Sequence, residues 1–138
     1  MYKQVSYGGV DYPFDTFFDM LFGVHNSKTA LVKGAISPAT DAYLNDTQLV
    51  VEYEIPGATE SSIEIKLNKS ELQVTAEKAK TSEDKLLRAE RTYGKYTRVF
   101  TLGEEYGADK LEATYKDGIL RLVIPRKPEA QPKTFKVK

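Results

Sequence analysis

The chain contains no cysteine, one histidine and no apolar run long enough to cross a membrane. Without cysteine it can form no disulfide, no thiolate nucleophile and no cysteine metal site. His25 alone cannot build the usual zinc site or anchor a catalytic triad, so we interpret it as a solvated side chain. A spanning helix needs about 20 predominantly apolar residues, and the sequence has no such stretch. These absences argue against redox, zinc-dependent and membrane-spanning functions.

Catalytic motifs are missing as well. Gly94-Lys95 does not complete a phosphate-binding loop, because Ala89 stands at the first glycine position and Tyr96 at the Ser/Thr position. No serine lies in a Gly-x-Ser-x-Gly elbow. The carboxylates alternate with lysine and arginine in strand-like segments, which is typical of a solvated face. We therefore expect no enzyme, no cofactor and no metal.

Charge is balanced over the whole chain, with 20 basic and 20 acidic residues, but it is unevenly distributed. Residues 38–125 carry a net charge of −4, and residues 126–138 carry a net charge of +4. A nucleic-acid-binding domain normally presents a concentrated basic face, so no nucleic-acid partner is expected. The N-terminus lacks a basic region followed by an apolar core, which predicts no signal peptide and a cytoplasmic location.

Residues 1–37 concentrate aromatic side chains ahead of any strand pattern. Five apolar residues follow the spacing of one helix face: Phe14, Phe17, Phe18, Leu21 and Phe22. Pro13 suits the first turn of such a helix, and Gly23 lies just past its end. A helix of about ten residues is not stable alone in water, so this face must be buried against something.

Three interpretations of the aromatic face are open. It packs on its own domain, it anchors the chain at a membrane surface, or it is an adhesive surface held in check by assembly. Asp15 and Asp19 lie on the polar face, where anionic lipid would favour lysine, so we expect no membrane partner.

Residues 38–125 alternate apolar and polar side chains in short segments, which predicts antiparallel strands. The segments read QLVVEYEI, IEIKLN, ELQVTAE, KYTRVFTL, LEATY and ILRLVI. Inward side chains are expected at Leu49, Val51, Tyr53, Ile55, Ile63, Ile65, Leu67, Leu72, Val74 and Ala76. Turn signals occur at residues 56–57, 68–70 and 116–118, and residues 78–85 form a polar loop. At least six strands at this spacing predict an all-β, immunoglobulin-like antiparallel β-sandwich.

Residues 128–138 form a basic tail. Pro128 and Pro132 disfavour a helix and predict an extended chain. Phe135 and Val137 then lie on the same side of the chain, a pattern that suits docking into an apolar groove. The alternative is a frayed terminus with two incidental apolar residues.

Several blocks of sequence occur in a characteristic order. Residues 38–41 read PATD, residues 49–57 read LVVEYEIPG, residues 89–102 read AERTYGKYTRVFTL, and residues 113–120 read ATYKDGIL, followed by PRK at 125–127. In this order the blocks resemble the small heat-shock proteins, the α-crystallin-domain family of ATP-independent chaperones. The resemblance spans residues 38–127. It divides the chain into a flexible aromatic arm (1–37), an α-crystallin-type sandwich (38–127) and a flexible C-terminal tail (128–138).

The C-terminal tail and one corner of the domain differ from the family's usual sequence. The tail sequence at residues 135–137 occupies the place of the family's Ile-x-Ile/Val motif, with Phe135 at the first isoleucine position. Gly103 stands where the family usually has proline, at a corner between a strand and a loop.

The resemblance implies a holdase that suppresses aggregation of unfolding client proteins without ATP and works as an oligomer of dimers. The loop at about residues 78–91 would add a strand to the sheet of a partner subunit. The implied dimer-interface residues are Leu86, Leu87, Glu90, Arg91 and Arg98. For Arg98 the alternative is an exposed surface charge of little energetic value.

Larger oligomers would form through the tail, and clients would bind the aromatic arm. Phe135 and Val137 would dock on a neighbouring subunit, with Ile65, Leu67 and Ala113 as candidate groove residues. Phe14, Phe17, Phe18, Leu21 and Phe22 would hold clients by apolar contact, which needs no sequence code. The alternative function is a β-sandwich adaptor that binds one defined partner and remains monomeric.

Overall fold

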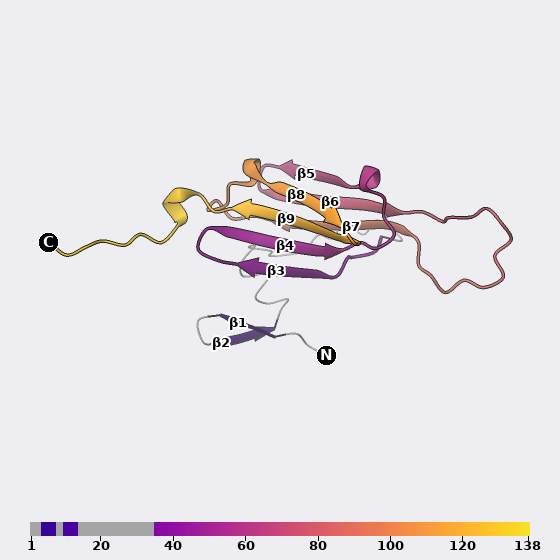
Figure 1. The fold of residues 1–138 in the computed structure, drawn as a ribbon, viewed down its shortest axis with the longest axis horizontal. Helices are drawn as coiled ribbons and strands as arrows, with labels where there is room; N and C mark the ends of the chain where they lie inside the picture. The colour runs from indigo at the N-terminus through magenta and orange to yellow at the C-terminus, as the bar shows by residue number, and fades with distance from the viewer. Residues whose placement is uncertain (1–3, 8–9, 14–34) are drawn as a thin grey trace.

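The structure, a computed structural model, describes residues 4–7, 10–13 and 35–138. Seven strands form two antiparallel sheets that enclose one core, which confirms the predicted β-sandwich (Figure 1). The four-stranded sheet contains, in spatial order, β3 (Thr40–Leu44), β4 (Gln48–Glu54), β9 (Ile119–Pro125) and β8 (Glu112–Lys116). The three-stranded sheet contains β5 (Glu64–Asn68), β6 (Glu71–Lys78) and β7 (Gly94–Thr101) in that order.

The core comes from alternate residues of the inner strands, as the period of two requires. The predicted inward residues of β4 and β6 are buried; they are Leu49, Val51, Tyr53, Leu72, Val74 and Ala76, together with Ile55 just after β4. The prediction is only partly right for β5, where Ile65 is half-buried and Leu67 is 42% exposed. Because β5 is the outer strand of its sheet, its inward face lies at the margin of the core.

Tight turns connect the strands where glycine and polar signals predicted them. Lys116 pairs with Ile119 across Asp117 and Gly118, whose φ angles of 54° and 77° are those of a type I′ hairpin. A Cβ atom at Gly118 would lie 3.2 Å from the Cα of Pro56, so the neighbouring turn also favours glycine here. That neighbouring turn places Gly57 at a φ of 83°.

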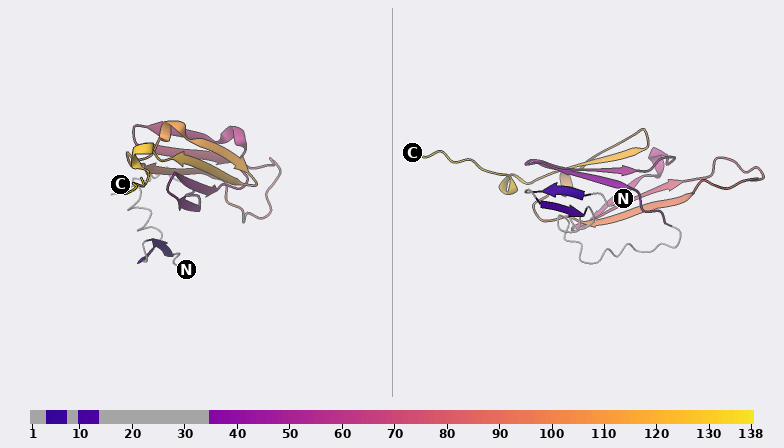
Figure 2. Two further views of the ribbon diagram at one scale, coloured as in Figure 1. Left: turned by 60° about the vertical axis from the view of Figure 1, so that its left-hand side comes forward. Right: turned by 90° about the horizontal axis from the view of Figure 1, so that it is seen from below.

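The N-terminal region contains a hairpin that the sequence did not predict. Strands β1 (Gln4–Tyr7) and β2 (Val10–Pro13) form a two-stranded antiparallel sheet outside the sandwich (Figure 2). Pro13, expected in the first turn of a helix, is instead the last residue of β2. The rest of the predicted helix, residues 14–22, lies outside the described residues.

Two segments leave the sandwich at opposite ends (Figure 1). The loop between β6 and β7, residues 79–93, projects beyond one end, and the tail after β9 extends from the other. The sequence predicted an extended tail, but Pro128–Ala130 forms a short 3-10 helix, η3. Proline suits the first position of a helical turn, where its missing N–H needs no partner. Two further 3-10 turns are η1 (Glu60–Ser62) and η2 (Ala108–Lys110).

Candidate assembly interfaces

Four strand edges are available at the margins of the two sheets. Strands β3 and β8 bound the four-stranded sheet, and β5 and β7 bound the three-stranded sheet. The β7 edge is partly covered, since the Ile36 N–H donates to Lys95 O at 2.8 Å and the Thr97 N–H donates to Ile36 O at 3.1 Å. An uncovered edge presents backbone donors and acceptors that can pair with another chain.

The long loop carries apolar side chains that its own subunit leaves in solvent. Leu86 is 58% exposed and Leu87 is 90% exposed, and residues 79–93 form no strand. Arg88 and Glu90 form an exposed ion pair at 2.9 Å. At the base of the loop Arg91 lies over the ring of Tyr93, with 5.3 Å between the guanidinium carbon and the ring centroid. The predicted dimer residues of the loop are therefore accessible.

Arg98 does not lie with those loop residues, because β7 directs its side chain toward the other sheet. It is half-buried, and its Nη1 donates at 3.0 Å both to Pro38 O and to Thr40 Oγ1. Its guanidinium also lies over the ring of Phe100, 5.5 Å from the centroid. These contacts connect β7 to the start of β3 within one subunit. The alternative of a loosely held surface charge is therefore wrong.

The candidate groove residues lie on the two outer strands of one long side of the sandwich, the upper side in Figure 1. Ile65 and Leu67 belong to β5, and Ala113 is an exposed residue of β8. The tail does not lie against these residues. Phe135 is 85% exposed and Val137 is 99% exposed, and the tail points away from its own sandwich (Figures 1 and 2).

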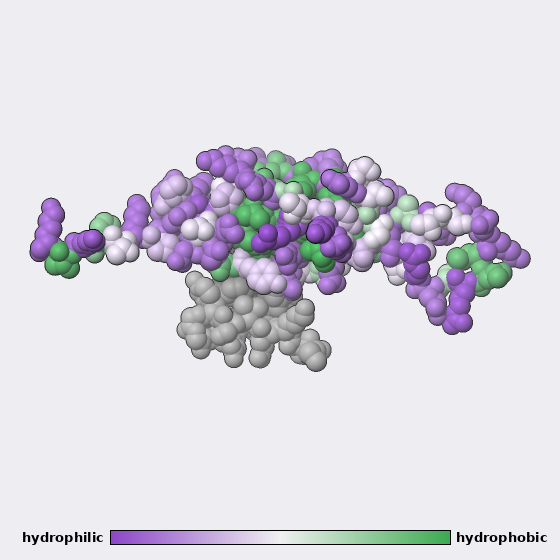
Figure 3. Space-filling view, in the orientation of Figure 1, coloured by the Kyte–Doolittle hydropathy of each residue, from purple (hydrophilic) through white to green (hydrophobic). Residues whose placement is uncertain are grey.

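Hydrophobic side chains thus remain uncovered at both ends of the molecule (Figure 3). The large apolar side chains exposed in the described part of the chain are Tyr43, Leu67, Leu86, Leu87, Phe135 and Val137. The sequence analysis named Leu86, Leu87, Phe135 and Val137 as contact residues and placed Leu67 both inward and in the groove. It did not name Tyr43, which lies with Asp41 on the exposed face of β3. The five predicted client-binding residues, Phe14, Phe17, Phe18, Leu21 and Phe22, lie outside the described residues.

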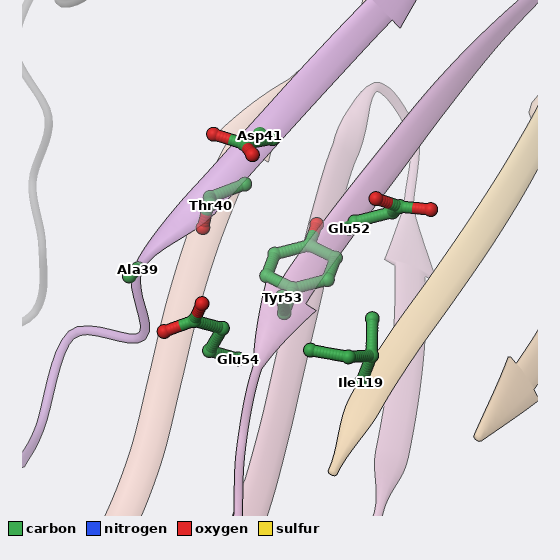
Figure 4. A pocket seen from close by; sticks show the side chains of 7 residues that line it. All are labelled: Ala39, Thr40, Asp41, Glu52, Tyr53, Glu54 and Ile119. Atoms are coloured by element: carbon green, nitrogen blue, oxygen red, sulfur yellow. The ribbon is translucent and has the colours of Figure 1, made fainter. Parts of the chain in front are cut away.

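A small pocket at the end of β3 and β4 carries three carboxylates. Its volume is about 120 Å³, and Asp41, Glu52 and Glu54 are among its lining residues (Figure 4). Glu52 is bound by Arg121 at 3.4 Å. Within residues 4–7, 10–13 and 35–138, no group of three or more histidines, cysteines or acids could hold a metal ion. The pocket offers no metal centre.

Tyr53 also contributes to this pocket, but its hydroxyl is buried and has no hydrogen-bond partner among the described residues. Burial raises the pKa of Tyr53 far above its usual range, because the phenolate would be desolvated, and the charge of Arg98 opposes this only in part. Burial therefore favours the neutral phenol in the folded protein.

No helix in the described part of the chain is long and apolar enough to cross a membrane. The described residues show two exposed apolar segments, in the loop and in the tail, and three edge strands besides the partly covered β7, namely β3, β5 and β8.

Comparison with known proteins agrees with this picture. A model described as the Hsp20/alpha crystallin family matches residues 41–138. The 18 kDa antigen 2 of Mycobacterium avium is 34% identical over 79% of this chain and 82% of its own. Small heat shock protein C4 of Rickettsia felis is 30% identical over 93% of this chain and 80% of its own. A small heat-shock protein structure from Xylella fastidiosa superposes with a TM-score of 0.63 at 27% identity, over 75% of this chain and 97% of its own.

Proposed function

Because the chain belongs to the Hsp20/alpha crystallin family of non-enzymatic chaperones, we propose that it is an ATP-independent holdase that binds unfolding proteins and keeps them from aggregating. In this proposal the working form is an oligomer of dimers in the cytoplasm. The partners are other copies of the chain and unfolding clients, with no nucleic acid and no membrane.

The observation that carries the assembly part is the complementarity of exposed segments and uncovered edges. Leu86 and Leu87 are exposed in the described part of their own subunit, and the outer edge of β3 pairs with no other described strand. Phe135 and Val137 need a groove, and the side between β5 and β8 leaves Leu67 exposed. Burying a Leu or Phe side chain contributes roughly 1.5–3 kcal/mol. Several such contacts per subunit favour association.

The two contacts would give a hierarchy of assembly. The loop adds a strand to a partner's sheet and forms a two-fold dimer, in which residues 86–91 contact the partner. Arg98 supports this interface from within its subunit by holding the start of β3. The tail then joins dimers by weak contacts that permit exchange of subunits. The related Xylella fastidiosa protein is described as having a distinct high order structure.

Client binding is assigned to the aromatic arm on its sequence pattern. Four phenylalanines on one face offer apolar contact without sequence preference, which suits a chaperone of many clients. The decisive variant changes Phe14, Phe17, Phe18 and Phe22 together to Ser. Its matched control changes the same four residues to Leu, which keeps the face apolar.

The test measures light scattering of a heat-aggregating client without ATP. We expect the parent and the Leu variant to suppress scattering and the Ser variant to lose suppression, while circular dichroism shows an intact β-domain in all three. Full protection by the Ser variant would show that clients bind the sandwich and not the aromatic arm. A protein that is monomeric by light scattering and protects no client would instead support the adaptor function.

A further inference from the structure

The N-terminal hairpin has one apolar and one polar face. Its register pairs Val5 with Tyr12 and Tyr7 with Val10. Residues directly opposite each other in an antiparallel pair share a face, and successive pairs alternate between the two faces. These four residues therefore make up one apolar face, and the opposite face consists of Gln4, Ser6, Asp11 and Pro13. A single two-stranded hairpin is at best marginally stable in water, so its apolar face needs a second surface.

An apolar row crosses the outer face of the four-stranded sheet. Tyr43 of β3 pairs with Val50 of β4, which pairs with Val123 of β9. Tyr43 is 54% exposed and Val123 is half-buried, whereas Val50 is 5% exposed although it does not belong to the core cluster. The neighbouring row on the same face is charged and consists of Asp41, Glu52 and Arg121. Figure 3 shows this face, with hydrophobic surface over β4 and β9 among hydrophilic side chains.

We propose that the β1–β2 hairpin packs its apolar face onto this row of its own subunit, as a second β-layer over Tyr43, Val50 and Val123. Adjacent strands lie about 4.8 Å apart, so the row is about 10 Å long. The apolar face of the hairpin is about 5 Å wide and about 7 Å long, because it spans two strands and two residues along each strand. With its strands along the row, the hairpin stays clear of the charged row, which lies about 7 Å away. Packing of β-layers at near right angles is an established arrangement.

The position of the hairpin and the path of the arm favour this occupant. The hairpin lies on the β3 side of the sandwich, where Tyr43 begins the row (Figures 1 and 2). The arm joins the sandwich on the same side, since Ile36 is bonded to β7, whose Arg98 contacts the start of β3. Residues 14–35 connect Ile36 to the hairpin, and at about 3.3 Å per extended residue they are long enough to reach the row. A tethered hairpin has a high effective concentration at its own sheet.

Docking would fix where the aromatic segment of the arm begins. Phe14 directly follows Pro13, the last residue of β2. The docked hairpin would therefore hold Phe14 beside the sandwich and leave the later phenylalanines available to clients. Anchorage and client binding are separate properties, so the docking can be absent while the holdase function remains.

The chain contains no tryptophan, so a single introduced tryptophan reports on one position. Tyr43→Trp and Val123→Trp place probes in the apolar row, and Thr114→Trp places a control probe on β8 in the charged row. Each full-length probe chain is compared with a version in which the apolar face of the hairpin is changed to Ser, at Val5, Tyr7, Val10 and Tyr12. The matched control changes the polar face to Ser, at Gln4 and Asp11.

The measurements are the wavelength of tryptophan emission and its quenching by acrylamide. We expect both probes of the row to emit at short wavelength and to be quenched little when the apolar face is intact, with or without the polar-face changes. Serine on the apolar face should shift their emission to longer wavelength and raise quenching several-fold, while Thr114→Trp stays unchanged. Val123→Trp is decisive, because β9 lies two strands from the β3 edge, where a partner's loop could cover Tyr43→Trp.

Three results would overturn docking within the subunit. Row probes that do not respond to serine on the apolar face would show that the hairpin does not cover the row, and an equal response of Thr114→Trp would show a general change of the sheet. For the third, a Val123→Trp chain with the serine hairpin is mixed with excess parent chain, which lacks tryptophan, and subunit exchange is verified by mass. Recovery of short-wavelength emission would show that a neighbouring subunit supplies the hairpin; we expect no recovery.

Discussion

Removing the hydroxyl group from Tyr53 and from Tyr115 should change the free energy of unfolding in opposite directions. Tyr53 is fully buried, and no group in the described part of the chain forms a hydrogen bond with its hydroxyl. The Tyr115 hydroxyl lies 3.1 Å from Ile55 O and 3.0 Å from Ala58 O, and it ties β8 to the turn after β4. Replacing each tyrosine with phenylalanine removes one oxygen and leaves the ring in place.

The expected magnitudes follow from the cost of burying a polar group. A buried hydroxyl without a partner costs about 1–3 kcal/mol, and a satisfied hydrogen bond contributes about 1 kcal/mol. Tyr53→Phe should therefore raise the free energy of unfolding by about 1 kcal/mol. The ring keeps its contact with Phe100, in which the two ring centroids are 5.7 Å apart. Tyr115→Phe should lower it by about 1 kcal/mol, because its single donor is lost.

The assay is urea unfolding of the full chain at pH 7. All variants must be compared at one protomer concentration, because association contributes to the measured stability. A change of midpoint at constant slope reports stability. If Tyr53→Phe were destabilised by 1 kcal/mol or more, the hydroxyl would have a partner, for example a buried water, and the reasoning would be refuted.

Alkaline pH provides a second measurement on the same pair. Burial raises the pKa of Tyr53, so the folded protein keeps the phenol neutral, whereas the unfolded chain ionises it near pH 10. The stability from this group is complete below about pH 10 and is lost as pH rises, by at most ~1.4 kcal/mol per pH unit. Tyr53→Phe should flatten that decline. An unchanged slope above pH 10 would show that Tyr53 is not the titrating group.

Three further changes test the turn, the sheet-to-sheet contact and the tail. Gly118→Ala should destabilise the fold by about 1–2 kcal/mol, because its φ of 77° is left-handed and its Cβ would crowd Pro56. Asp117→Asn should be neutral in the same urea unfolding, since asparagine tolerates this turn. Arg98→Met should lower the free energy of unfolding in urea by about 1–3 kcal/mol, because Pro38 O and Thr40 Oγ1 lose a charged donor; an unchanged midpoint would show that these bonds are replaced by water. Deleting residues 128–138 should leave a folded dimer by light scattering, since the exposed tail lies outside the sandwich; large oligomers of unchanged mass would show that the tail does not join dimers.

Local pattern was enough to predict most of the sandwich. Alternation located six of the seven sandwich strands, all but β3, and the buried residues of β4 and β6, because a strand with one face in the core must repeat every two residues. The sequence of residues 116–118 predicted a hairpin that adopts left-handed φ angles at Asp117 and Gly118. The apolar pair of the tail was also found by its sequence pattern, whereas the leucines of the loop were named from the family resemblance.

Other features depend on contacts between residues far apart in the chain. Leu67 and Leu72 have the same alternation, yet only Leu72 is buried, because β5 lies at the edge of its sheet and β6 lies in the middle. Arg98 bonds to a carbonyl sixty positions earlier, and the partnerless hydroxyl of Tyr53 depends on which groups the opposite sheet brings near it. Sequence alone therefore determined which residues alternate and where the chain turns. Tertiary structure decided which strands are edges and which polar groups find partners, because both depend on packing between the two sheets.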